Sequence, residues 1–165
     1  MTALAAVAPP LDFDRLYRDA RDDVYAYAAT LLRDRSAAED VTAAAFERAY
    51  RKRTSFDERR GSPRAWLFGI ARHAALDELR RRKRVAALPF EPPEAAEDVA
   101  ELAARRQAVL TALSGLSARE RELIALRYYA GLSNTELAAV VGVSATNAGT
   151  LVHRAMTKLR EAVDD

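Results

Sequence analysis

Apolar residues recur at three- and four-residue steps over most of this sequence, the spacing that places them on one face of an α-helix. The first such stretch predicts a helix from Phe13 to Leu32. Its acidic residues concentrate in the first half, where they interact favourably with the helix dipole. The apolar stripe of this helix consists of Phe13, Leu16, Tyr17, Ala20, Val24, Tyr27, Ala28 and Leu31.

A second helix is predicted from about Ala37 to Lys52. Ser36 with Glu39 three residues later forms the capping-box pattern that opens many helices. One side of the helix carries Val41, Ala45, Phe46 and Ala49. A polar loop over residues 54–61 separates this helix from the next one.

The third helix has the clearest start signal and a strongly basic end. Ser62 and Pro63 suit the N-cap and the first helical position, and the helix is predicted to reach Arg84. Its apolar face consists of Trp66, Leu67, Ile70, Ala71, Ala74 and Ala75. Trp66 is expected to pack in the core, because large aromatic side chains on an apolar stripe usually do, and a rim position that touches DNA is the alternative.

Residues 85–100 interrupt the helical pattern with three prolines, several acidic residues and no basic residue. This composition predicts an acidic, proline-stiffened linker between two domains. The predicted fold class is therefore all-α. It comprises a flexible N-terminus at residues 1–12, a helical bundle at residues 13–84, the linker, and a second helical domain at residues 101–165.

The second domain carries the pattern of a helix-turn-helix. A helix over about residues 98–113 is followed by two capping boxes, Ser117 with Glu120 and Ser133 with Glu136. Gly142-Val143-Ser144 then forms a tight turn, and Ser144 caps a last helix that reaches about Ala162. Two helices joined by a short glycine-containing turn are typical of DNA-binding domains, although non-binding helical hairpins share the pattern.

Charge is concentrated in the middle of the chain. The formal net charge is only +2, yet twelve of the 26 lysine and arginine residues lie between residues 51 and 84, with four of the 24 acidic residues. Such a basic segment indicates a nucleic-acid surface. A solvated basic helix end is the simpler alternative, and charge alone does not decide between them.

Composition narrows the remaining classes. The absence of cysteine excludes disulfides, zinc ribbons and a cysteine nucleophile, and it is compatible with a reducing cytoplasm. No apolar run approaches the roughly 18 residues of a membrane span, and the N-terminus lacks a signal-peptide pattern, so no membrane insertion is expected. His73 and His153 have no neighbouring ligands, and no phosphate-binding loop occurs. We therefore expect no cofactor, no metal and no enzymatic activity.

In this order and at these spacings, the motifs resemble those of the extracytoplasmic function (ECF) sigma factors, the minimal type with sigma domains two and four alone. The resemblance rests on FDRLYRDARDDVYAYAATLLRD and FDERRGSPRAWLFGIARHAALDELRRRKR in the first half, and on LSARERELIALRYYAGLSNTELAAVVGVS followed by HRAMTKLR in the second. It implies core RNA polymerase as a partner, through the β′ clamp helices and the β flap. Promoter DNA and a helical anti-sigma protein that inserts between the domains are the other implied partners.

The resemblance also implies roles for individual residues. The polymerase-binding set is Asp40, Phe46, Arg48 and Arg51. The set that binds and opens the −10 element is Phe56, Arg59, Arg60, Ser62, Arg64, Arg72, His73, Arg80, Arg81, Arg82 and Lys83. The set that binds the −35 element is Ser144, Thr146, Asn147, Thr150, His153, Arg154 and Lys158.

Some positions depart from the family pattern. Residues 41–45 lack the usual polar contacts after Asp40, and His73 replaces a frequent asparagine. Gly149 and Leu151 replace two cations of the recognition helix, so weak −35 binding is expected, with Gly149 allowing the backbone to approach DNA closely. The competing functions are a dimeric helix-turn-helix regulator that binds duplex DNA and an all-helical protein adaptor. Neither explains the basic third helix as well as a sigma factor does.

Overall fold

The computed structural model describes residues 10–85 and 100–165, and every regular element within them is helical. The helices are α1 (Phe13–Leu32), α2 (Arg35–Arg51), α3 (Pro63–Val85), α4 (Ala100–Ser114), α5 (Ala118–Tyr128), α6 (Asn134–Val141) and α7 (Ala145–Asp164). Two 3-10 turns, Arg53–Ser55 and Glu58–Arg60, lie between α2 and α3. The all-α prediction is therefore confirmed.

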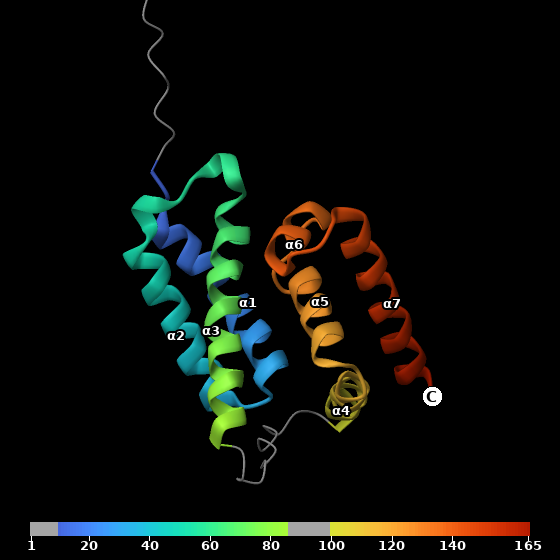
Figure 1. Ribbon diagram of the computed structural model, residues 1–165. Helices are drawn as coiled ribbons and strands as arrows, with labels where there is room; N and C mark the ends of the chain where they lie inside the picture. The colour runs from blue at the N-terminus through green and yellow to red at the C-terminus, as the bar shows by residue number, and fades with distance from the viewer. Residues whose placement is uncertain (1–9, 86–99) are drawn as a thin grey trace, which may run out of the picture.

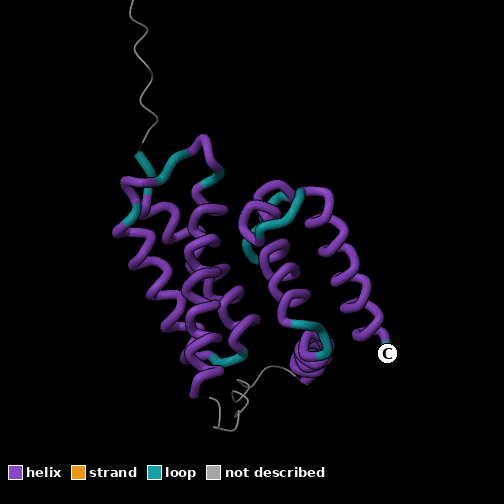
Figure 2. Tube along the Cα trace, viewed as in Figure 1, coloured by secondary structure: helices purple, strands orange, loops and turns teal. Residues whose placement is uncertain are grey.

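The helices form two bundles that stand side by side (Figure 1). The first bundle is α1–α3 and the second is α4–α7. Short connections join the helices within each bundle, and they are drawn in teal in Figure 2. The predicted linker at residues 85–100 lies almost entirely outside the described residues, and so does most of the predicted flexible N-terminus.

The start of α2 differs from the prediction. Arg33 adopts a left-handed conformation with a φ of 55°, and the chain turns there. This turn brings the carboxylate of Asp34 to the N–H of Ala37, at 3.0 Å, so that Asp34 is the N-cap. The predicted capping box at Ser36 and Glu39 is therefore wrong, and Ser36 lies inside the helix as an exposed residue.

The predicted starts of α1, α3, α5, α6 and α7 are confirmed, whereas the start predicted near residue 98 lies outside the described residues. Ser62 Oγ accepts a hydrogen bond from the N–H of Ala65 at 3.1 Å, and Pro63 is the first residue of α3. Both capping boxes of the second bundle are formed, and Ser144 caps α7. Gly142 ends α6 with a φ of 77°, a conformation that glycine adopts without strain.

Alanine allows the helices of the first bundle to approach closely. Seven alanines of this bundle are fully removed from solvent, namely Ala20, Ala28, Ala38, Ala45, Ala49, Ala71 and Ala75. Larger side chains fill the space between the two bundles. Tyr27 of α1 and Phe68 of α3 pack edge to face at 5.7 Å, in one core cluster with Leu123, Leu126 and Leu137 of the second bundle. The bundles therefore share a core.

We expect Phe68→Ala to lower the free energy of unfolding by about 3–5 kcal/mol, because it leaves a cavity in this shared core. Leu102→Ala is the control, since Leu102 is 59% exposed on α4 and its loss should change stability by less than about 0.5 kcal/mol. Urea unfolding followed by circular dichroism measures both. Equal effects of the two substitutions would contradict a shared core around Phe68.

Candidate nucleic-acid and polymerase interfaces

The loop between α2 and α3 holds two aromatic rings beside exposed arginines. Phe56 and Trp66 pack edge to face with centroids 5.5 Å apart, and both are half-buried. Trp66 packs against the core but is only partly buried, so it lies at the rim of the core instead of inside it. Arg59 and Arg60 are exposed. Hydrogen bonds from the backbone and then the side chain of Arg59 lower the pKa of Asp57, which holds the loop in its turn.

The basic end of α3 contains cations in two different states. Arg80, Arg81 and Lys83 are exposed. Arg81 donates to Glu78 at 2.7 Å, and this hydrogen bond lowers the pKa of Glu78. Arg80 lies 3.4 Å from Asp77 on the same helix. Such local pairs leave the cations at the surface, where a phosphate can displace or join the carboxylate.

Arg82 is in the second state, because it joins α3 to the end of α1. Its guanidinium donates to the carbonyl oxygen of Leu32 at 3.0 Å and to the carboxylate of Asp34 at 2.7 Å. Asp34 is also the N-cap of α2, and its pKa is lowered first by the N–H of Ala37 and further by Arg82. Of the predicted −10 residues, Arg82 thus has partners that hold three helices together.

Three more predicted −10 residues, Ser62, Arg64 and Arg72, face the second bundle. Ser62 Oγ donates to Glu136 Oε2 at 2.5 Å, and this bond lowers the pKa of Glu136. Arg64 donates to the carbonyl oxygens of Ala130 and Tyr129, at 2.5 and 2.7 Å, and it also pairs with Asp23. His73, a further predicted −10 residue, is exposed.

Arg72 takes part in a buried polar cluster between the bundles. Its Nε lies 2.5 Å from Glu122 Oε1, and the hydroxyl of Tyr27 donates to the same oxygen at 3.1 Å. Glu122 is only 7% exposed and Tyr27 is fully buried. Burial raises the pKa of Tyr27 well above its usual value, and the Glu122 carboxylate adds to this effect.

Sequence reasoning missed Glu122, Tyr27 and Glu136 as interface residues. One signal was present, because Glu122 lies four residues before Leu126 and so shares the inward face of α5. A glutamate on an apolar helix face calls for a cation that meets it. Nothing in the local pattern pointed to Arg72 as that cation, since the two residues are 50 positions apart.

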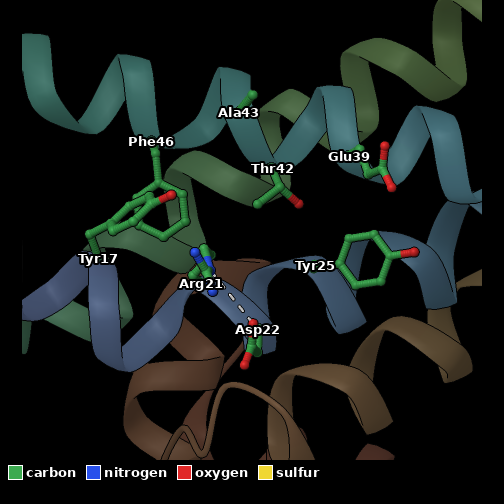
Figure 3. Close-up of a pocket in the computed structure, with 8 residues that line it drawn as sticks. All are labelled: Tyr17, Arg21, Asp22, Tyr25, Glu39, Thr42, Ala43 and Phe46. Carbon is green, nitrogen blue, oxygen red and sulfur yellow. Dashed lines mark ion pairs between the residues drawn. The ribbon is translucent and has the colours of Figure 1, made fainter.

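A groove of about 460 Å³ lies between α1 and α2 on the first bundle. Its lining, drawn in Figure 3, is Tyr17, Arg21, Asp22, Tyr25, Glu39, Thr42, Ala43 and Phe46. Phe46 is 5% exposed and is held edge to face by Tyr17, with centroids 4.8 Å apart. A lining of aromatic and charged side chains suits a protein partner more than a small polar ligand.

The predicted polymerase-binding residues divide between this groove and its surroundings. Phe46 lines the groove, whereas Asp40 and Arg51 are exposed on α2. Arg51 pairs with Glu47 at 2.5 Å within the same helix. Arg48 is directed toward α3, with Nη1 3.4 Å from Asp77. Sequence reasoning did not identify the α1 side of the groove, which the exposed Tyr17 marks.

The recognition helix α7 presents its predicted −35 residues to solvent. All seven of them, Ser144, Thr146, Asn147, Thr150, His153, Arg154 and Lys158, are exposed. Lys158 reaches back to α5, where its Nζ lies 2.5 Å from Glu120 and lowers the pKa of that carboxyl. The exposed residues at the start of α7 are uncharged. Arg154, one turn before Lys158, is the other arginine or lysine of the predicted −35 set.

Gly149 is half-buried against α6. A Cβ atom at this position would lie 2.9 Å from the side-chain nitrogen of Asn134. Asn134 in turn accepts a hydrogen bond from Arg127. The absence of a side chain at Gly149 thus leaves room for Asn134. Gly149 was expected to let DNA approach the backbone of α7, but in the structure α6 is the close neighbour at this position.

Family models match both bundles. The model of sigma-70 region 2 matches residues 16–85, and that of sigma-70 region 4 matches residues 106–159. Two parts define the class: a three-helix bundle with a basic helix, and a helix-turn-helix domain. The chain belongs to the sigma-70 family of non-enzymatic transcription initiation factors. Within this family it is an ECF RNA polymerase sigma factor, as its relatives indicate.

These relatives cover most of the chain. The ECF RNA polymerase sigma factor SigK of Mycobacterium sp. (strain KMS) is 34% identical over 76% of this chain and 69% of its own length. SigK of Mycobacterium tuberculosis (strain ATCC 25618 / H37Rv) is 28% identical over 92% of this chain and 86% of its own. Both similarities extend across the two bundles.

Two solved structures share the fold. The sigma factor RpoE, in complex with the anti-sigma factor NepR from Bartonella quintana, has a TM-score of 0.78 and 28% identity, covering 93% of this chain and 97% of its own. CnrH, in complex with the cytosolic domain of CnrY, has a TM-score of 0.66 and 27% identity, covering 92% of this chain and 87% of its own.

Among the described residues, none of the helices combines the length and the apolar character that a membrane span needs.

We expect the stability of the protein to fall as the pH rises above about 10, the ordinary pKa of tyrosine. The folded protein keeps Tyr27 protonated, so its stabilisation is complete below that pH and is lost as the pH rises toward the higher pKa of the folded state. Urea unfolding between about pH 9 and 11 measures this slope. Tyr27→Phe should flatten the slope, and an identical slope in the variant would show that another group is responsible.

Proposed function

We propose that the first bundle of this sigma factor holds core polymerase and opens the −10 element, while α7 binds the −35 element. Transcription from a promoter requires both contacts at once, and a chain that carries two bundles can make both. We also propose that the protein acts in the cytoplasm and that the polymerase performs all of the chemistry.

The aromatic pair Phe56 and Trp66 is the observation that carries the −10 assignment. A half-buried aromatic edge beside two exposed arginines is suited to a base that has left the duplex, because aromatic rings stack on any base and cations hold the adjacent backbone. The exposed cations Arg80, Arg81 and Lys83 lie near the other end of α3. They are suited to phosphates beyond the melted segment.

The groove between α1 and α2 supports the polymerase assignment. The rings of Tyr17 and Phe46 lie at one end of the groove, and the charged residues Arg21 and Glu39 also line it. Aromatic rings and charged side chains together are typical of protein interfaces. The β′ clamp helices are the proposed occupant of this groove, and the β flap is proposed to meet the second bundle.

An anti-sigma protein is proposed as a further partner. Similarity to RpoE, which was solved with the anti-sigma factor NepR, supports this proposal. A second groove of about 220 Å³ on the second bundle is lined largely by apolar residues of α4, α5 and α7, including Leu113, Ile124 and Met156. A helix of such a protein fits an apolar groove of this kind.

A dimeric helix-turn-helix regulator is the alternative function. It uses the exposed residues of α7 but leaves the aromatic loop and the groove of the first bundle without a role. Run-off transcription with core polymerase separates the two functions. A sigma factor supports defined transcripts that core polymerase alone does not make, whereas a regulator binds duplex DNA and supports none.

We expect Phe56→Ala to reduce promoter opening with little effect on closed-complex affinity. Loss of one stacked base costs about 1–3 kcal/mol, which is roughly a 5- to 150-fold change in the opening equilibrium. Permanganate footprinting of holoenzyme on a selected promoter measures opening. The control is Tyr50→Ala, which removes an exposed ring on α2 and should leave the footprint unchanged. An unaltered footprint with Phe56→Ala would sink the assignment of this loop.

The two states of the basic residues on α3 predict different consequences of their removal. Arg80→Ala with Lys83→Ala should lower the salt dependence of promoter binding by about 0.9 for each lost duplex phosphate contact and leave stability unchanged. Arg82→Ala should instead lower the free energy of unfolding by about 1–3 kcal/mol, because it removes charged hydrogen bonds that join helices. Salt titrations of binding and urea unfolding, run on both proteins, distinguish these outcomes. The reverse pattern would exchange the assigned roles.

A further inference from the structure

The side chain of Asn134 lies against the backbone of the recognition helix. Asn134 is the first residue of α6 and is exposed, and α6 meets α7 at one end of the second bundle (Figure 1). A Cβ atom at Gly149 of α7 would lie 2.9 Å from Asn134 Nδ2, 3.5 Å from its Cγ and 3.8 Å from its Oδ1. The amide of Asn134 therefore covers Gly149, with the amide nitrogen as the nearest atom.

Arg127 holds this amide in one orientation. One nitrogen of its guanidinium donates to the carbonyl oxygen of Leu132 at 2.8 Å, and another donates to Asn134 Oδ1. Leu132 is buried, so Arg127 is tied to a fixed point of the turn between α5 and α6. Because a guanidinium has donors only, it binds the amide oxygen and leaves the amide nitrogen directed away from it.

Gly149 belongs to the same side of α7 as two residues of the predicted −35 set. Thr146 lies three residues before it and His153 four residues after it, and both are exposed. Residues at these spacings are neighbours on a helix surface. Within the described residues, the two N–H groups of Asn134 Nδ2 have no acceptor. An open donor is thus placed beside the proposed DNA-binding side chains, at a point where α7 itself contributes none.

We propose that Asn134 is a further DNA-binding residue of the −35 interface. Its Nδ2 donates a hydrogen bond to an acceptor oxygen of the duplex, and Arg127 and Gly149 are the positioning residues that place this donor. The acceptor belongs to a backbone phosphate or to a base edge, since an amide donates to either. The inference rests on the proposed −35 role of α7, and it adds a contact from a second helix.

The orientation of the amide restricts what Asn134 recognises. An asparagine that pairs with adenine uses its oxygen and its nitrogen together. Here the oxygen is occupied by Arg127, so only the donor is left for DNA. A side chain at position 149 would displace the amide. A cation introduced there would consequently exchange with the Asn134 contact instead of adding to it.

Closed-complex binding by the full chain with core polymerase tests the contact. The probe is a labelled duplex that the holoenzyme selects from random sequences, and fluorescence anisotropy at a fixed salt concentration measures the affinity. Asn134→Ala should weaken binding on the order of tenfold, as expected for one hydrogen bond to a charged group. Gln107→Ala is the matched control, because it removes an exposed amide from α4, and it should match the parent protein.

Gly149→Ala tests the positioning. Its methyl group displaces the amide, so the substitution should weaken binding about as much as Asn134→Ala does. In the Asn134→Ala background it should cause no further loss of affinity. Alanine favours a helix more than glycine does, so urea unfolding of the double variant should show no loss of stability from this change. Additive losses of affinity would contradict the proposed pairing of the two residues.

Neutral methylphosphonate linkages, introduced one at a time across the −35 element, identify the acceptor. If it is a phosphate, one such linkage weakens binding by the parent protein but not by Asn134→Ala. If it is a base edge, replacement of a single base pair shows the same loss of additivity. The contact is refuted if neither series does so.

Asn134→Asp separates a contact to DNA from a role in folding. Aspartate keeps an oxygen for Arg127 but has no N–H, so this variant should be as stable as the parent protein in urea and bind DNA at least as weakly as Asn134→Ala. Equal affinity of Asn134→Asp and the parent protein would overturn the proposal, whatever the stability of Asn134→Ala.

Asn147→Ala and Arg154→Ala report on α7 itself. If they weaken binding while Asn134→Ala matches the parent protein, the inference fails and the proposed function stands. If Asn134→Ala weakens binding and they do not, the contact stands and the assignment of α7 as the reader of the −35 element fails. If none of the three changes the affinity, both fail.

Discussion

A carboxylate can be buried between two helical bundles only if cations and hydroxyl groups meet it there. Glu122 satisfies this condition through Arg72 and Tyr27, which come from two different helices of the first bundle. The alignment of α5 against α1 and α3 follows from this requirement. Once it is met, the apolar residues around it form one core that crosses from one bundle to the other.

The basic helix α3 performs several tasks that the charge count by itself does not separate. Its arginines divide into those that bind the second bundle, such as Arg64 and Arg72, and Arg82, which ties the ends of helices together. Exposed cations such as Arg80 and Lys83 form the third group. A strongly basic helix can thus pack against helices that carry acidic residues and still expose other cations to solvent. The number of cations open to a nucleic acid therefore depends on which partners the fold supplies.

The recognition helix α7, unlike α3, exposes little positive charge. Its exposed start is neutral, and Lys158 is paired with Glu120. We therefore expect the second bundle alone to bind DNA weakly, since phosphate contacts supply most non-specific affinity. Anchoring the first bundle on polymerase would raise the effective concentration of α7 at the promoter.

The sequence by itself determined the helices, most of their caps and the family. These features depend on residues three or four positions apart, and such signals are legible along the chain, as with Ser117 and Glu120 or Ser62 and Pro63. Only the tertiary structure decided that Arg33 turns the chain and makes Asp34 the cap of α2. It alone decided that Arg72 meets Glu122, since partners 50 residues apart are chosen by how whole helices pack and by the cost of leaving a buried charge unpaired.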